Sequence, residues 1–265
     1  MAQVNKPYQL VPGDEVRREA RCLTRRSFTV GAGATVAGLA GWGWLQTRSK
    51  EGGIPWPFRR MLAFNEKLSR AYFREDRLSP TYSQDEAAEP RENGDIGLPD
   101  KVVEKDWRLK VAGSGTEEVL TLNAIKYLPR YEMITELKCI EGWSTVVGWA
   151  GARLADFIAQ SPQASRSGRR PEGKRTDLFD YVSLTTPDNG YYVGLDLASA
   201  LHPQTLLCYE MNGQPLTTGH GAPLRLVIPL KYGIKNIKCI GAIRFTDRRP
   251  EDYWAERGYD WYAGH

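Results

Sequence analysis

Short apolar runs separated by turn residues fill the chain from residue 107 onward. Runs of this length that are rich in β-branched and aromatic residues predict strands rather than helices. Strands are expected at residues 107–111, 119–122, 131–140, 181–185, 191–195, 206–211, 224–228 and 237–246, and short helices at residues 123–128, 153–159 and 197–201. Strands and short helices in this mixed order predict an α+β fold with a mixed sheet.

Residues 51–106 show a different pattern. Prolines interrupt this stretch repeatedly, and one helix is expected near residues 60–73. A stretch of this kind usually crosses the surface of a domain. We therefore predict a targeting segment at residues 1–50, an extended wrapping segment at residues 51–106 and the main domain at residues 107–265.

The first fifty residues have the pattern of a targeting signal. No acidic residue lies between Glu19 and Glu51, and Thr24-Arg25-Arg26-Ser27-Phe28 precedes a glycine- and alanine-rich apolar run at residues 30–45. This arrangement looks like a twin-arginine signal and predicts export to the periplasm. The run is shorter than the ~20 residues that span a bilayer comfortably, and no small-residue cleavage site follows it. Both cleavage and retention as an inner-membrane anchor through residues 30–45 stay open; a basic amphipathic surface helix is disfavoured because the run has no polar face.

Charge and composition exclude several classes. The chain has a net charge of +4, but its first fifty residues carry +5, so the remainder is balanced at −1. A balanced folded part offers no positive surface to a nucleic-acid backbone, and we expect no nucleic-acid partner. The 41% of hydrophobic and 26% of charged residues exclude a polytopic membrane protein and a mostly disordered chain.

Common catalytic motifs are missing. The chain has three histidines and no HExxH, GxSxG or Walker sequence, which removes the usual signatures of hydrolases and nucleotide triphosphatases. Its four cysteines form no CxxC pair and have no histidine at zinc spacing. Of these, Cys208 and Cys239 fall in expected strands and are interpreted as buried thiols.

The first informative stretch covers residues 131–149. Met133, Thr135 and Leu137 alternate to one face of a strand, and Cys139 continues that line at its carboxyl end. A thiolate presented there suits a soft or high-valent metal. The alternative is a small buried hydrophobic residue, which is the commoner state of a lone cysteine.

The second informative stretch covers residues 212–247. It combines a strand in which Arg225 stands among apolar neighbours with glycine-rich turns, including Gly233-Ile234-Lys235. A buried arginine needs an anionic partner, and free backbone N–H groups in such turns can bind an anion. A bound phosphate and an internal carboxylate, Glu210 or Asp247, are equally acceptable partners on this basis.

Together, the two stretches resemble the molybdopterin domain of the sulfite oxidase superfamily, most closely the periplasmic methionine sulfoxide reductase catalytic subunits. The motif Cys-x-Glu-x-Trp-Ser-x-Val-Val is matched by Cys139, Glu141, Trp143, Ser144, Val146 and Val147. The resemblance runs from about residue 107 to residue 247. It implies a sulfite-oxidase-type fold of mixed sheets and short helices that binds molybdopterin with molybdenum.

The resemblance also implies roles for individual residues. Cys139 is expected to be the protein thiolate on molybdenum, and Glu141 is expected to face the open metal position and carry a proton. The expected cofactor contacts are Thr186, His220, Arg225, Gly233, Ile234 and Lys235.

Two departures from the family bear on the substrate. Sulfite oxidases place an arginine four residues after the metal-bound cysteine, where this chain has Trp143 with Glu141 nearby. An acidic, aromatic mouth disfavours sulfite and favours a neutral sulfoxide-like substrate. The Asn-Asn-Phe-Tyr-Glu-Phe segment of the reductases is not found, and residues 80–85 (PTYSQD) are its nearest counterpart.

The expected function is therefore that of an exported molybdenum oxidoreductase. It would transfer an oxygen atom with two electrons and reduce a sulfoxide-like small molecule. Since the chain has no CxxCH haem motif, the family implies a separate electron-transfer partner, a membrane haem cytochrome subunit. Sulfite dehydrogenase-like oxidation and a non-catalytic binding domain that retains the fold are the alternatives.

Overall fold

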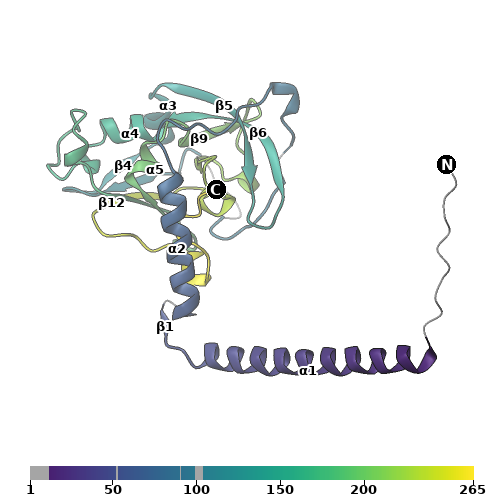
Figure 1. Cartoon of the computed structure of the whole chain (residues 1–265). Helices are drawn as coiled ribbons and strands as arrows, with labels where there is room; N and C mark the ends of the chain where they lie inside the picture. The colour runs from purple at the N-terminus through teal and green to yellow at the C-terminus, as the bar shows by residue number, and fades with distance from the viewer. Residues whose placement is uncertain (1–11, 52, 90, 99–103) are drawn as a thin grey trace. The chain divides into compact units, whose positions relative to one another are not determined.

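The computed structural model describes residues 12–51, 53–89, 91–98 and 104–265 (Figure 1). Residues 1–11 and 99–103 of the predicted segments lie outside the described residues. The chain divides into two compact units, one of residues 1–51 and 55–57, the other of residues 52–54 and 58–265. The boundaries predicted at residues 50 and 106 are not tested by this division and stay predictions.

The first unit is mainly one long helix, α1 (Gly13–Gln46). Asp14 and Glu15 occupy its first turn, where acidic side chains interact favourably with the helix dipole. Its large apolar side chains, such as Phe28 and Trp42, are exposed. In the described part of the chain, no helix combines the length and the apolar character that crossing a bilayer requires. The short strands β1 (Lys50–Glu51) and β2 (Ile54–Pro55) follow α1 along the chain.

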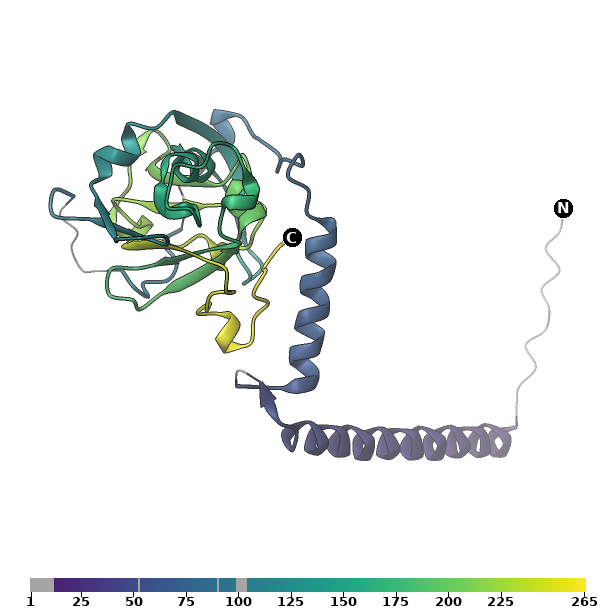
Figure 2. The ribbon, with the colours of Figure 1, turned by 90° about the vertical axis from the view of Figure 1, so that its left-hand side faces the viewer.

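The second unit contains two five-stranded sheets (Figure 2). One has the strand order β10-β9-β6-β5, with β11 also paired to β9; the other has the order β4-β3-β12-β7-β8. The strands of the first sheet are β5 (Arg130–Lys138), β6 (Ser144–Arg153), β9 (Leu206–Met211), β10 (Gln214–Pro215) and β11 (Arg225–Val227). Those of the second are β3 (Leu109–Ala112), β4 (Glu118–Leu120), β7 (Tyr181–Thr185), β8 (Tyr192–Asp196) and β12 (Ala242–Thr246). Because β3 and β12 are parallel and their neighbours antiparallel, the predicted mixed sheet is confirmed.

Four α-helices accompany the sheets: α2 (Trp56–Tyr72), α3 (Leu122–Lys126), α4 (Leu154–Gln160) and α5 (Leu197–Leu201). α2 runs along one side of the sheet body (Figure 2). Arg70 of α2 lies 3.5 Å from the carboxylate of Asp196 at the end of β8, and the Phe73 ring just beyond α2 packs edge-on against Tyr262. α2 is therefore held by β8 and the carboxyl-terminal segment.

The main hydrophobic core joins the two sheets and α4. Leu109, Val182 and Ile243 from the second sheet share it with Leu207 and Leu226 from the first. Leu154, Phe157 and Ile158 of α4 point into the same core. A second, smaller core covers the other side of the first sheet, where Met133 and Leu137 of β5 pack against Val147 and Trp149. The apolar face expected for this strand is thereby confirmed.

The predicted elements are mostly present, most of them with ends shifted by one or two residues, and two differences are larger. Residues 181–185, 206–211 and 197–201 match the observed strands and helix residue for residue. The strand expected at residues 237–246 is wrong in its first half: residues 237–241 form a turn in which Cys239 has φ 49°, and β12 begins at Ala242. The central strand β6 was not predicted, because six consecutive buried residues leave it without the alternation that marks a half-exposed strand.

Candidate active site

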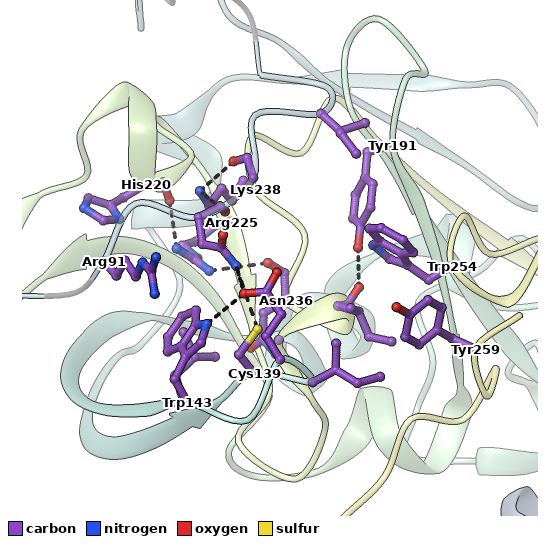
Figure 3. Close-up of a pocket in the computed structure, with 18 of the residues that line it drawn as sticks. Arg91, Cys139, Trp143, Tyr191, His220, Arg225, Asn236, Lys238, Trp254 and Tyr259 are labelled. Carbon is purple, nitrogen blue, oxygen red and sulfur yellow. Dashed lines mark hydrogen bonds between the residues drawn. The ribbon is translucent and has the colours of Figure 1, made fainter. Parts of the chain in front are cut away.

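A pocket lies where β5 ends and the chain turns back into β6 (Figure 3). The turn is held by main-chain hydrogen bonds from Cys139 N to Trp143 O, at 2.8 Å, and from Gly142 N to Cys139 O, at 3.1 Å. Gly142 has φ 91°, a left-handed conformation that favours glycine. This closed turn presents the side chains of Cys139, Glu141 and Trp143 together at one edge of the sheet.

Cys139 is half-buried at the centre of the pocket. Its Sγ lies 3.8 Å from Asn93 Nδ2. Burial raises the pKa of the Cys139 thiol, and the nearby Glu141 carboxylate raises it further. With no metal bound, the group is a neutral thiol at pH 7, and metal ligation there would release its proton.

Glu141 and Trp143 form the mouth next to this thiol. Trp143 Nε1 donates a hydrogen bond of 2.9 Å to Glu141 Oε2, and Asn93 Nδ2 donates to the same oxygen at 3.4 Å. The guanidinium of Arg91 lies 5.9 Å from the centre of the Trp143 ring. The mouth is therefore acidic and aromatic, as expected, but it also contains a cation and an amide that the sequence did not indicate.

Arg225 supplies the inner, polar wall of the pocket. Its side chain is 4% exposed and donates from Nη1 to His220 O at 2.9 Å and from Nη2 to Asn236 O at 3.4 Å. The Trp149 ring lies 4.8 Å beneath the guanidinium carbon, and Nε has no hydrogen-bond partner among the described residues. Burial lowers the pKa of Arg225 to about 10. A buried cation with an unused donor beside a pocket is the arrangement expected of an anion site.

The internal carboxylates that could have paired with Arg225 are engaged elsewhere. Glu210 accepts a hydrogen bond of 2.6 Å from Arg130, and Asp247 is paired with Arg166. The sequence left both a bound anion and an internal carboxylate open as the partner of Arg225, and the structure favours the bound anion.

Lys238 is a second cation on the same wall, and the sequence analysis missed it. Its Nζ donates to the carbonyls of Asn93 at 2.9 Å and Gly219 at 2.7 Å. Burial and, to a smaller extent, the nearby Arg225 lower the pKa of Lys238 to about 8. Burial, Arg225 and Lys238 also lower the pKa of His220. The pairing of Leu226 N with Ile237 O, at 2.9 Å, places the turn that carries Lys238 beside the strand that carries Arg225. That pairing is a tertiary fact which no local sequence signal reveals.

The predicted site residues fall into two groups. The pocket is lined by Cys139, Glu141, His220, Arg225, Gly233 and Ile234. Lys235 does not line it: its Nζ forms a buried ion pair of 2.5 Å with Asp252 and donates to Gly194 O at 2.9 Å. Thr186 does not line the pocket either, and its hydroxyl donates a hydrogen bond of 2.6 Å to Asp188. The Thr186 side chain packs against Gly97 so closely that a Cβ at position 97 would lie 2.6 Å from it. The cofactor contacts expected of these residues stay predictions.

An aromatic wall faces the polar one. Tyr191, Trp254 and Tyr259 stand together on the side of the pocket opposite Arg225 (Figure 3). The Tyr191 hydroxyl donates a hydrogen bond of 2.6 Å to Ile234 O, and burial raises its pKa, so it remains a neutral donor. The aromatic-rich sequence of residues 253–262 was the available signal for this wall.

A family model matches a long part of the chain. The model for the oxidoreductase molybdopterin binding domain covers residues 96–254, which include the Cys139 turn, Arg225 and Lys238 of the polar wall, and all of the aromatic wall except Tyr259.

Curated relatives agree with this match. A putative protein-methionine-sulfoxide reductase subunit YedZ1 of Azospira oryzae is 29% identical over 98% of this chain and 98% of its own length. The protein-methionine-sulfoxide reductase catalytic subunit MsrP of Xanthomonas campestris is 37% identical over 56% of this chain and 47% of its own. Mitochondrial sulfite oxidase of Drosophila melanogaster is 28% identical over 63% of this chain and 32% of its own. The chain thus spans nearly all of the first relative but half or less of the other two.

Proposed function

Because the chain belongs to the oxidoreductase molybdopterin-binding family, we propose that it is an exported enzyme that reduces a sulfoxide-like substrate by two-electron oxygen-atom transfer. The sulfite-oxidase-type α+β fold and the molybdenum-molybdopterin cofactor expected from the sequence are confirmed by this membership. The observation that carries the proposal is the placement of the Cys139 thiol between a cationic wall and an open aromatic mouth.

The residues present fit that cofactor. Cys139 offers one soft sulfur ligand of the kind that suits a high-valent centre. Arg225 and Lys238 provide buried positive charge for the anionic phosphate of a pterin. Two donors beside them, Arg225 Nε and Trp149 Nε1, are buried without a hydrogen-bond partner in the part of the chain that the structure describes. Buried donors are normally satisfied, so these atoms are accounted for by a ligand on this wall.

When bound, the molybdenum cofactor supplies the two-electron redox chemistry. The side chains of the mouth position the substrate and move protons. Glu141 Oε2 is occupied by Trp143 and Asn93, which fixes the carboxylate over the thiol and leaves Oε1 to carry a proton to the reacting oxygen. Ile96 and Ile140 line the same pocket and offer apolar contacts to the alkyl groups of a sulfoxide.

One observation supports a second candidate, sulfite dehydrogenase-like oxidation. Arg91 lies beside Trp143 and lines the pocket, so a cation is available to attract an anionic substrate. The two activities are separated by assaying sulfoxide reduction with a reduced dye and sulfite oxidation with an oxidised dye. Substitution Arg91→Gln would remove the second activity and spare the first if Arg91 serves sulfite.

We also propose that the twin-arginine sequence directs export to the periplasm and that residues 30–45 contact the inner membrane. The relatives whose names include "subunit" support a separate partner protein, and the absence of a CxxCH motif in the sequence supports an electron donor outside this chain. A membrane haem cytochrome subunit would meet that need.

The central test is the metal and pterin content of protein purified from a host that makes molybdopterin. The wild-type chain should contain close to one molybdenum and one pterin, and Cys139→Ser should lose at least about a hundredfold in turnover. Arg225→Met should lose the pterin itself, whereas Cys22→Ser, which changes an exposed cysteine of α1, should match the wild type. Absence of both pterin and molybdenum from the wild type would sink the catalytic proposal and leave the binding-domain alternative.

A further inference from the structure

One face of α2 is an apolar surface that no other described residue of the second unit covers. Met61, Phe64, Leu68 and Tyr72 are 60%, 55%, 55% and 58% exposed. Their spacing of three or four residues places them on one side of the helix, and we call these four residues the α2 stripe. A row of four large exposed side chains differs from the scattered single apolar residues of ordinary surfaces, and it indicates a binding surface.

The stripe does not result from a poorly packed helix. The side of α2 that faces the body is held by polar contacts: Glu66 pairs with Arg70 at 3.0 Å and with Arg249 at 2.8 Å. Arg70 also lies 5.1 Å from the centre of the Tyr262 ring. α2 therefore has a fixed orientation, and the four side chains of the stripe remain more than half exposed.

Basic residues border the stripe. Arg60 and Lys67, seven residues apart, follow its outer side, and Arg77 lies 4.0 Å from the centre of the Tyr72 ring. The one acidic residue of α2, Glu66, belongs to the inward side, and Asp76 just beyond the helix is paired with Arg74 at 2.7 Å. The exposed side of α2 is thus apolar and cationic, which complements an apolar surface that carries negative charge.

A cavity continues this surface at the carboxyl end of the helix. It has a volume of about 680 Å³, and Leu68 and Tyr72 of the stripe line its near side. Arg74, Arg77 and Lys138 line the rest together with Ser69, Ser79, His265 and apolar residues. Arg74 is paired with Asp76, and Lys138 lies 3.8 Å from Glu136. A space of this size next to an apolar stripe suits the phosphate head group of a lipid, with Arg77 as the cation that faces it.

From the stripe, its basic border and this cavity, we propose that α2 lies flat on an anionic lipid bilayer, with the α2 stripe in the interface and a lipid phosphate at the cavity. An aromatic and aliphatic face bordered by arginine and lysine is the pattern of interfacial helices. This surface is distinct from residues 30–45 and does not depend on the catalytic reaction.

The test is hydroxyl-radical footprinting of the full chain with vesicles, because it separates α2 from α1. Vesicles of phosphatidylglycerol mixed with phosphatidylcholine should lower labelling of Met61, Phe64 and Tyr72 by about threefold or more, and pure phosphatidylcholine should protect them much less. Tyr127, which is 90% exposed on another surface, is the internal control and should not change.

A charge-insertion variant completes the test. Met61→Glu/Phe64→Glu should abolish the protection of Leu68 and Tyr72, while Val119→Glu, at an exposed apolar site on β4, should retain it. Molybdenum content checks that both variants are folded. Vesicle binding without protection of the stripe would assign the membrane contact to α1 alone and overturn the proposal. Protection that needs an added protein subunit, or that is equal on neutral vesicles, would overturn it as well.

Discussion

Lys235 and Lys238 lie three residues apart on one turn, yet their ammonium groups have opposite surroundings. Lys235 is 1% exposed and is paired with Asp252, which is 2% exposed. Lys238 faces the pocket, and its hydrogen-bond partners among the described residues are carbonyl oxygens. One lysine therefore neutralises a buried carboxylate, and the other supplies positive charge to a ligand. The same residue type serves stability at one position and binding at the other.

Substitution of each lysine by methionine should separate these two effects. Lys235→Met leaves Asp252 buried without a partner and should lower the free energy of unfolding by about 3–5 kcal/mol. Lys238→Met removes a pocket cation and should lower the pterin content of purified protein, with little loss of stability. Denaturant titration of the cofactor-free proteins and pterin analysis of the loaded ones provide the measurements. If Lys238→Met kept full pterin content while Lys235→Met lost pterin without being destabilised, the assignment of roles would be reversed.

The lowered pKa of Lys238 also predicts a pH dependence of stability. Below about pH 8, Lys238 is charged in both the folded and the unfolded protein. The unfavourable free energy of burying this charge then lowers the stability of the folded state in full. As the pH rises from about 8 toward the ordinary lysine value of 10.5, the folded state loses the proton first. The free energy of unfolding of cofactor-free protein should therefore increase over this range.

The variant Lys238→Met isolates this contribution. Burial also lowers the pKa values of Lys231 and Lys235, so the wild-type slope has several sources. Urea titrations at several pH values between 7.5 and 10.5 should give a shallower increase for Lys238→Met than for the wild type. Equal slopes would show that Lys238 keeps its ordinary pKa.

Individual site residues were predictable to different degrees. Cys139, Glu141 and Arg225 stand out in the sequence through their motif or through an apolar setting, and all three line the pocket. The sequence could not show which of Lys235 and Lys238 faces the pocket. That difference depends on the ion pair between Lys235 and Asp252, which lies 17 residues further along the chain. Asn93 carries no local signal at all, since its contact with Cys139 joins residues 46 apart.

At the scale of elements, β6 holds the first sheet together, pairing with β5 on one side and β9 on the other. At Gly151 the two strands β6 and β9 come so close that an added Cβ would lie 2.1 Å from Leu207 O. The register shifts between Ala150 and Gly151, which marks a bulge at this approach. Glycine is required here because a side chain has no room to enter.

Gly151→Ala should consequently destabilise the protein strongly. The added methyl group must push β6 away from the backbone of β9, and overpacking of this kind costs about 1–3 kcal/mol or more. Gly148→Ala in the same strand is the matched control, because its Cβ would meet Asn212 Oδ1 at 3.3 Å, an atom of a side chain that can shift. Thermal unfolding of both variants gives the comparison. A similar loss of stability in the two would contradict the close approach at Gly151.

The elements that local patterns identify are those with one exposed face or clear turn signals. β7 alternates between buried and half-buried residues, and residues 181–185 were predicted correctly. β6 has six consecutive buried residues, four of which are glycine or alanine, so it lacks alternation and is rich in strand formers only in its first half. Its strand conformation comes from pairing on both edges, which is a property of the whole sheet.

At the scale of the whole second unit, the α2 stripe and the catalytic mouth lie on neighbouring surfaces. A cavity lined by Asn65 and Leu68 of α2 is also lined by Ile140 and Ile234, and these two isoleucines line the Cys139 pocket. If α2 rests on a bilayer, the mouth opens close to the lipid surface. An electron donor embedded in that membrane would then reach the pocket without the protein leaving the bilayer.

This arrangement predicts a difference between two electron sources. Met61→Glu/Phe64→Glu changes the stripe but no residue that lines the Cys139 pocket, so turnover with a soluble reduced dye should equal that of the wild type. Turnover driven by a haem subunit reconstituted in anionic vesicles should fall by about tenfold, since the enzyme would no longer be concentrated at the surface of its donor. Val119→Glu should behave as the wild type with both donors. An equal loss of turnover with both donors would mean that the substitutions damage the pocket. No loss of turnover with either donor would mean that electrons reach the cofactor in the pocket by a route independent of α2.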